Sequence, residues 1–218
     1  MIRRDYILRL VAEMVQMLLR VVSLKHRREY DQALREVDAA LRKVGGGQAD
    51  AAPTQTVEDW IALCRKHELA ASGLMVPVAD LLREQGEIHA LQGRPVESGR
   101  ARRLALGLFL EAILGGETFI TADLLDKVEE LIEATGDLSP SAEISQRLAQ
   151  YFESRGHHAR AEDAVFAWLE TGDPRARSEG RAFYERILQL DDAALERGGL
   201  PRAEAEQGMK DFLAASGS

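Results

Sequence analysis

Cysteine is almost absent from this sequence of 218 residues, in which Cys64 is the single example. A lone cysteine excludes a disulfide within the chain and is typical of proteins from a reducing compartment, so we expect a cytoplasmic protein. Aromatic residues are also scarce, at 6% of the chain. Valine, isoleucine and threonine never gather into alternating runs, which argues against a sheet.

Long uncharged apolar segments are lacking as well. The most apolar stretch, residues 1–24, is interrupted by Asp5, Arg9, Glu13 and Arg20. A helix that spans a bilayer needs about 20 nearly uncharged residues, and a secretion signal needs an uninterrupted apolar core of about 7–15 residues. We therefore expect neither a membrane span nor a signal peptide, and a membrane is not an expected partner.

Sequence motifs for catalysis and cofactor binding are missing. The chain has no P-loop, dinucleotide-binding fingerprint, nucleophile elbow or zincin helix. Cys64 and His67 could reach one metal ion from a helix, but a structural zinc site needs a second pair of ligands, which the sequence lacks. The formal net charge of −8 disfavours binding to nucleic acid. We therefore predict no enzyme activity, cofactor, metal site or nucleic-acid partner.

Helical spacing dominates what the sequence does contain. In residues 4–24 apolar side chains recur every three or four positions, and similar patterns, ended by glycine or proline, follow along the chain. The expected helix starts are Thr56, Pro77, Thr121, Ser139-Pro140 and Asp173-Pro174. The sequence predicts an all-α protein of about ten helices with no sheet, stacked as antiparallel helical hairpins.

The expected domain organisation is simple. We predict a single helical-repeat domain over residues 1–218. Three consecutive glycines, Gly45 to Gly47, followed by small and polar residues, predict a flexible linker over residues 45–55 between the N-terminal hairpin and the rest. Small residues at the end of the chain predict a disordered tail over residues 215–218.

The third predicted hairpin has a distinctive arrangement of small and large residues. Leu148, Ala149 and Phe152 lie on its first helix, Gly156 in the turn and Ala161 on its second helix. This pattern resembles the tetratricopeptide repeat (TPR), in which small residues let two helices approach closely. The resemblance implies a right-handed α-solenoid.

The chain as a whole is similar to an uncharacterised bacterial family of TPR-like proteins of unknown function. The segments that carry this similarity run from Met1 to Tyr6, from Glu29 to Leu34 and from Gly198 to Pro201. The resemblance implies a bacterial source and a helical-repeat fold, and it brings no known activity with it.

In a repeat solenoid, the first helix of each hairpin lines a concave groove. On the second and third hairpins we predict that the groove is lined by polar residues: Arg83, Glu87, Gln146, Gln150 and Glu153. Such a groove would bind an extended peptide or a helix of another protein. The predicted function is therefore a non-catalytic protein–protein interaction or scaffold module.

The first helix is apolar at the corresponding positions, which are Val15, Leu18 and Val22. Covering three such side chains would contribute roughly 4–8 kcal/mol, so we expect that something covers them. The candidates are a later helix of the same chain, a second copy that forms a homodimer through this helix, and a helix of a partner protein.

Two further functions stay open. An enzyme or small-ligand sensor would need a buried histidine or a buried group of carboxylates, and the candidates are His89, Asp126, Glu129, Glu130 and Glu133. Peripheral membrane contact would instead use the apolar first helix, within residues 1–24.

Overall fold

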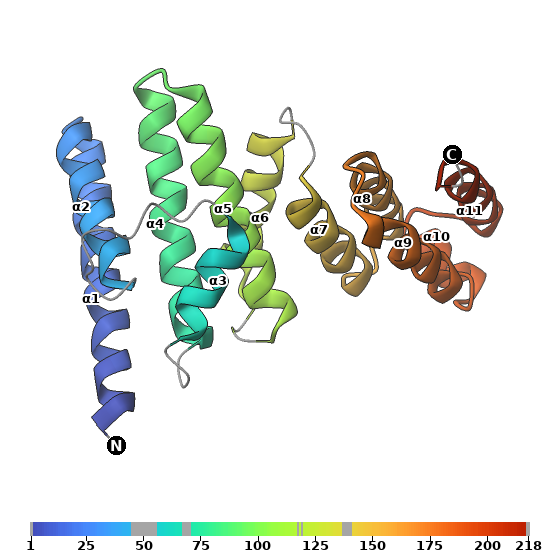
Figure 1. The fold of residues 1–218 in the computed structure, drawn as a ribbon, viewed down its shortest axis with the longest axis horizontal. Coiled ribbons are helices and arrows are strands. Elements are labelled where there is room, and N and C mark those ends of the chain that lie inside the picture. Colours follow the sequence, from blue (N-terminus) through green and yellow to red (C-terminus); the bar gives the residue numbers. More distant parts are fainter. Residues whose placement is uncertain are drawn as a thin grey trace. The chain divides into compact units, whose positions relative to one another are not determined.

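The computed structural model describes residues 2–44, 56–66, 71–116, 118, 120–136 and 141–216. Within these ranges the chain forms eleven helices and no strand, so the predicted all-α fold of about ten helices is confirmed (Figure 1). The helices are α1 (Ile2–His26), α2 (Tyr30–Val44), α3 (Val57–Arg65), α4 (Ala71–Leu91), α5 (Pro95–Leu114), α6 (Ala122–Thr135), α7 (Ala142–Ser154), α8 (His158–Glu170), α9 (Pro174–Ile187), α10 (Asp192–Arg197) and α11 (Arg202–Ser216).

The helices form two compact units, Met1–Leu138 with α1 to α6 and Ser139–Ser218 with α7 to α11. In the first unit, α4 and α5 make the most extensive pair, α1 and α2 pack on each other and on α4, and α3 lies against α4 and α5 (Figure 1). α6 packs on α5. In the second unit, α7 pairs with α8, α9 packs on α8, and α11 contacts both α8 and α9. The single domain expected over residues 1–218 stays a prediction.

The core of the first unit is built around α5. Its apolar run from Leu104 to Leu110 is buried, because α3, α4 and α6 pack around this helix. Gly86 allows α4 to approach α5 closely, since a Cβ atom at this position would lie 2.7 Å from Cγ of Arg102 and 3.2 Å from the carbonyl oxygen of Ser98. This contact holds α4, the centre of the candidate site, against the core.

Capping side chains define three of the predicted helix starts. Thr56 and Thr121 accept hydrogen bonds from the backbone N–H three residues later, at 3.1 and 3.2 Å, and so begin α3 and α6. Asp173 caps α9, whose first residue is Pro174. These three starts are confirmed.

Two other predicted helix starts are wrong. α4 begins at Ala71 and holds Pro77 in its interior, where buried apolar neighbours keep the helix intact across the one backbone hydrogen bond that proline cannot donate. α7 begins at Ala142 after the cap Ser141, and not at the Ser139-Pro140 pair, which lies outside the described residues. The two serines have the same capping chemistry, so the sequence alone did not separate them.

The predicted linker over residues 45–55 lies outside the described residues. The predicted tail over residues 215–218 is helical at its start, because α11 continues to Ser216, and the last two residues lie outside the described part. Among the described helices, none is both long and apolar enough to cross a bilayer.

Candidate functional site

The polar side of α4 is the centre of the candidate site. Asp80, Arg83, Glu84 and Glu87 follow one another at spacings that place them on one side of the helix. Asp80 and Glu84 are buried, and Arg83 and Glu87 are half-buried. Charged groups stay buried only when opposite charges and hydrogen bonds compensate their lost hydration, so neighbouring helices must supply partners.

The helix α1 supplies the first partner, Lys25. Its Nζ lies 2.5 Å from Oε2 of Glu84 and donates a second hydrogen bond to Oε2 of Glu87. Burial acts to lower the pKa of Lys25, but the hydrogen bonds and charges of the two carboxylates outweigh it and raise this pKa above its ordinary value. Lys25 therefore ties α1 to α4 as a cation.

The helix α6 supplies further partners. Nζ of Lys127 lies 3.0 Å from a carboxylate oxygen of Asp80 and 3.0 Å from one of Asp123. Nη1 of Arg83 lies 3.6 Å from Oε2 of Glu130. The pKa of Lys127 is also raised, because its two carboxylate neighbours outweigh the opposing effect of burial. We refer to the four side chains of α4 and these partners, Lys25 of α1 and three residues of α6, as the ion cluster.

These contacts show that α1, α4 and α6 run in the same direction. Along α1 and α4, Val11 lies next to Gly73 and Lys25 next to Glu87. Along α4 and α6, the ion pairs from positions 80 and 83 reach positions 127 and 130. The three helices therefore form one face of the first unit. The contacts also show which residues of neighbouring helices lie at the same height along this face. We call it the α1–α4–α6 face.

The cations of the ion cluster are more deeply buried than its outer carboxylates. The side chains of Lys25, Arg83 and Lys127 are 13%, 19% and 22% exposed. Those of Asp123 and Glu130, both on α6, are 77% and 66% exposed. The three cations are thus less accessible to solvent than Asp123 and Glu130. The charge that reaches solvent on the α6 side is therefore negative.

An apolar stripe on α1 ends at Val22, about one helical turn before Lys25 of the ion cluster. Val15 and Leu19 are 41% and 58% exposed, and Leu18 and Val22 are half-buried. A different side of α1 faces α2, where Glu13 pairs with Lys43 and Arg20 with Glu36. We call these four apolar residues the α1 stripe. One candidate to cover Val15, Leu18 and Val22 was a later helix of the same chain. Among the described residues, no helix covers these three side chains completely.

The five predicted groove residues divide between the two units. Arg83 and Glu87 lie together in the ion cluster, 3.2 Å apart. In the second unit, Glu153 accepts hydrogen bonds of 2.7 and 2.8 Å from Nε and Nη2 of Arg186, which joins α7 to α9. Gln146 and Gln150, on the same side of α7, are half-buried and exposed. Three of the five residues are therefore committed to ion pairs between helices.

A family model matches residues 1–217 of the chain. The chain belongs to DUF6483, a family of unknown function. No curated protein and no solved structure matches it. Membership of DUF6483 confirms that the chain comes from an uncharacterised family, and it assigns no activity.

Several residues of the site in this DUF6483 chain were missed from the sequence. Leu19 lies one helical turn from Val15 and three residues before Val22, so the breadth of the apolar pattern was the available signal. Lys25 carries no such signal, because its partner Glu84 is 59 residues away in the sequence. The spacing of Asp123 and Lys127 indicates their pair on α6, but it gives no sign of the second partner of Lys127, Asp80 on α4. Only the packing of the helices brings these charges together.

The candidates for an enzyme or sensor pocket do not converge among the described residues. Asp126 and Glu133 are exposed on α6, and Glu129 is half-buried. His89 is half-buried on α4, and burial lowers its pKa. The part of the chain that the structure describes contains no group of three His, Cys, Asp or Glu side chains that could hold a metal ion, and His67 lies outside it.

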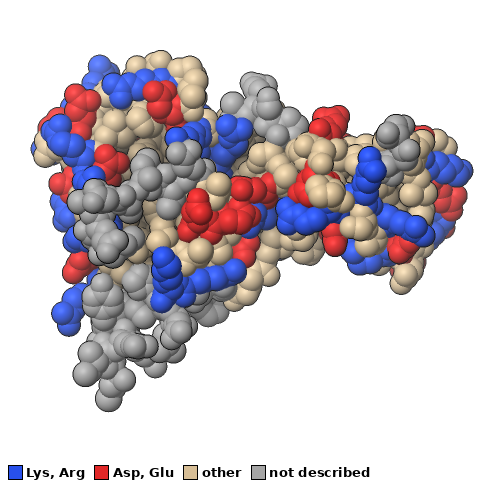
Figure 2. Space-filling model, in the orientation of Figure 1, with Lys and Arg blue, Asp and Glu red and all other residues tan. Residues whose placement is uncertain are grey.

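Other parts of the surface carry both signs of charge. On the visible face, Lys and Arg side chains lie among Asp and Glu side chains in each unit (Figure 2). Exposed pairs such as Arg181 with Glu185 add little stability because water screens them. A mixed surface of this kind also offers little attraction to a phosphate backbone.

Proposed function

We propose that this protein is a non-catalytic interaction module that binds a helix or extended peptide of another protein on the α1–α4–α6 face. The observation that supports the proposal is the exposed α1 stripe, which ends about one helical turn before Lys25 of the ion cluster. Apolar residues rimmed by polar ones are typical of protein interaction sites.

The energetics favour an occupant for this face. Removing Val15 and Leu19 from water would contribute roughly 1–2 kcal/mol each, since part of each side chain is already buried. Leu18 and Val22 would add a smaller amount for the same reason. A helix that lies along α1 would contact all four, because they recur every three or four residues.

We also propose that the helical hairpins are related to tetratricopeptide repeats. We regard the hairpins as TPR-like, because Gly156 forms the α7–α8 turn with φ of 73° and Ala149 and Ala161 are buried on the paired helices. The buried lone cysteine, Cys64, is compatible with a bacterial cytoplasm as the location. Gln146 and Gln150 would then offer polar contacts on the corresponding side of α7.

A second copy of the chain is the other occupant that the exposed stripe favours. Two α1 helices could pair through Val15 and Leu19, and the dimer would place the same surface of both copies in contact. Light scattering of the purified protein measures the mass directly. A monomer at all concentrations would remove this candidate.

The proposal is tested by affinity purification with variants of the stripe. Val15→Gln/Leu19→Gln removes apolar surface while keeping good helix formers. Leu190→Gln/Leu213→Gln is the matched control, because these two apolar residues are 36% and 42% exposed and belong to the second unit, away from the α1–α4–α6 face. We expect the stripe variant to lose specific partners that the wild type and the control retain. Identical partner lists for all three proteins, together with an unchanged mass, would overturn the proposal.

A further inference from the structure

We propose that the partner of the α1–α4–α6 face is a basic amphipathic helix, with apolar side chains towards α1 and Lys or Arg side chains towards α6. The inference rests on the proposed function and specifies the chemistry of the partner. It follows from the difference between the two edges of this face, one apolar and one anionic.

The two edges lie opposite each other at known levels. Because Lys25 meets Glu87, the residue one turn earlier on α1, Val22, lies near the level of Arg83. Arg83 in turn meets Glu130 of α6. An apolar residue of α1 and an exposed carboxylate of α6 therefore face each other across α4.

The same arrangement recurs two turns earlier along the three helices. Asp80 meets Lys127, so Asp123, one turn before Lys127 on α6, lies near the level of Val76 on α4. Val15 lies ten residues before Lys25 on α1 and therefore near the level of Pro77, next to Val76. The apolar edge and the acidic edge thus run parallel over at least two helical turns. A partner helix that lies along this face can therefore contact both edges.

The net charge of the ion cluster determines which charge the partner must carry. The ion cluster contains five carboxylates and three cations, so it keeps two formal negative charges after all its pairs are formed. Asp123 and Glu130 are its most exposed members, and none of its three cations is more than 22% exposed. A partner that approaches this edge meets carboxylates, so electrostatic complementarity selects Lys and Arg.

A binding assay with two synthetic helices tests the inference. The first peptide, about 18 residues long, has leucine on one face and lysine on the other, and the second has glutamate in place of every lysine. Both carry a fluorescent label, and their binding to the full chain is followed by anisotropy at low and high salt. We expect the lysine peptide to bind at least about tenfold more tightly than the glutamate peptide, with a difference that shrinks as salt rises.

Charge variants separate this face from the general acidity of the chain. Asp123→Asn/Glu130→Gln removes the two exposed carboxylates with little change in shape, and Glu170→Gln/Glu206→Gln removes two exposed carboxylates of the second unit. We expect the first variant to bind the lysine peptide about fivefold to tenfold more weakly and the second to change affinity less than twofold. Circular dichroism confirms that both variants keep the helical fold.

The outcomes distinguish the inference from the proposed function. Equal weakening by both charge variants would overturn the inference, because the whole chain and not this face would attract the peptide. Equal binding of the two peptides, lost in Val15→Gln/Leu19→Gln, would overturn the basic partner and leave the binding face standing. Binding that does not depend on Val15 and Leu19 would overturn both.

Discussion

Lys25 of α1 places its ammonium group 2.5 Å from the carboxylate of Glu84 on α4, where the Glu84 side chain is only 3% exposed. The two residues are 59 positions apart in the sequence, so their pair joins the N-terminal hairpin to the helix at the centre of the first unit. A buried pair of this kind contributes less through its attraction than it would cost if one partner were removed.

The first prediction concerns Lys25→Met, which keeps the apolar stem and removes the charge. Glu84 would keep Nη2 of Arg83 at 2.9 Å but lose its other cation. Stranding one member of a buried pair costs about 3–5 kcal/mol, and the remaining arginine reduces this, so we expect the first unit to lose about 2 kcal/mol of stability. Urea unfolding followed by Trp60 fluorescence, in a Trp168→Phe background, measures this unit separately.

The matched control for this prediction removes both charges. Lys25→Met/Glu84→Gln leaves no stranded carboxylate, so the double variant should be more stable than Lys25→Met alone. If the double variant is less stable than the single one, Glu84 is held mainly by Arg83 and the role given to Lys25 is wrong.

The features of this fold that could be predicted from the sequence are those that depend on residues close together in the chain. Thr56, Thr121 and Asp173 cap helices through contacts within three residues, and all three were found. Pro77 was misread because local chemistry favours proline at a helix start, whereas burial of its neighbours keeps α4 continuous. Where tertiary packing competes with a local preference, packing decides.

In the candidate site too, contacts within one helix could be predicted from the sequence, and contacts between helices could not. Arg83 and Glu87 could be placed together on α4 because they are one helical turn apart. Their role in pairs with α1 and α6 could not be predicted, since it depends on how helices distant in the sequence pack. The exposure of Leu19 needed the structure for the same reason, because periodicity gives a direction on a helix and not the neighbour that covers it.

The second prediction concerns Glu162, which accepts a hydrogen bond of 2.6 Å from the hydroxyl group of Tyr184. Burial raises the pKa of Glu162, although the tyrosine hydrogen bond opposes this, and it raises the pKa of Tyr184 as well. A raised pKa means that the folded state holds the proton more tightly than the unfolded chain. The stabilisation is complete below pH 4.5 and is lost as the pH rises through the folded-state value.

Glu162→Gln should therefore stabilise the second unit at neutral pH. The amide oxygen can still accept from Tyr184, and the cost of a half-buried charge is gone, so we expect a gain of about 0.5–1 kcal/mol at pH 7 and little change below pH 4.5. Trp168 fluorescence in a Trp60→Phe background reports this unit. A loss of stability at pH 7 would show that the ionised carboxylate is favourable here.

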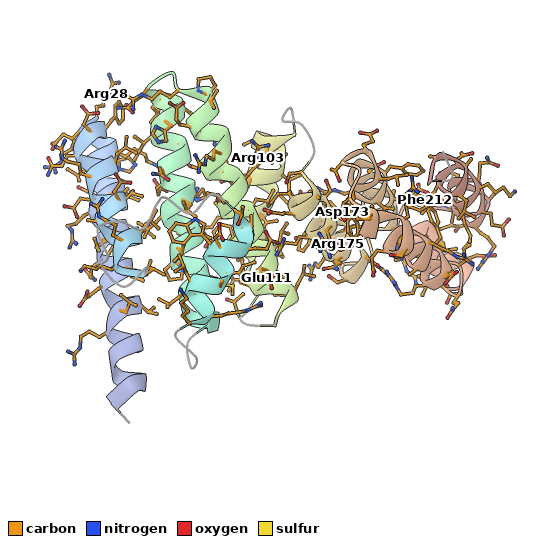
Figure 3. The ribbon with its side chains drawn as sticks, in the orientation of Figure 1. Arg28, Arg103, Glu111, Asp173, Arg175 and Phe212 are labelled. Atoms are coloured by element: carbon orange, nitrogen blue, oxygen red, sulfur yellow. The ribbon has the colours of Figure 1, made fainter. Side chains whose placement is uncertain are left out.

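The third prediction concerns Gly180 in α9, which lies against the ring of Phe212 from α11. Phe212 is labelled in Figure 3. A Cβ atom at position 180 would come within 2.2 Å of Cζ of this ring. The ring is fully buried and has Phe166 and Tyr184 as neighbours, with ring centroids 5.7 and 5.8 Å away, so it has little room to move. In most helices a change from glycine to alanine stabilises, and here it should destabilise.

We expect Gly180→Ala to lower the stability of the second unit by about 2 kcal/mol, measured by the same Trp168 unfolding assay. Phe212→Leu makes room for the added methyl group, so the double variant Gly180→Ala/Phe212→Leu should lose less stability than the two single variants added together. A stabilising effect of Gly180→Ala alone would contradict the close contact between α9 and α11.

The fourth prediction concerns His158, a buried residue at the start of α8. Its ring packs on Gly198, where a Cβ atom would lie 2.2 Å from Cδ2, and the N–H of Ala159 donates to the carbonyl oxygen of Gly198 at 3.1 Å. Burial lowers the pKa of His158, the charge of Glu153 opposes this, and His157 adds to it. The turn after α10 thus depends on an uncharged ring beneath it.

A lowered histidine pKa has a defined effect on stability. The unfolded chain binds the proton more tightly, so the contribution of His158 is complete above pH 6.5 and is lost as the pH falls through the folded-state value. We expect the His158 ring protons to titrate with a midpoint below 6.5 by nuclear magnetic resonance. In a Glu162→Gln background, which removes the opposite trend of that carboxylate, the second unit should lose stability below pH 6.5. His158→Gln should flatten that profile, and a midpoint above 6.5 would show that the ring is solvated or paired in its charged form.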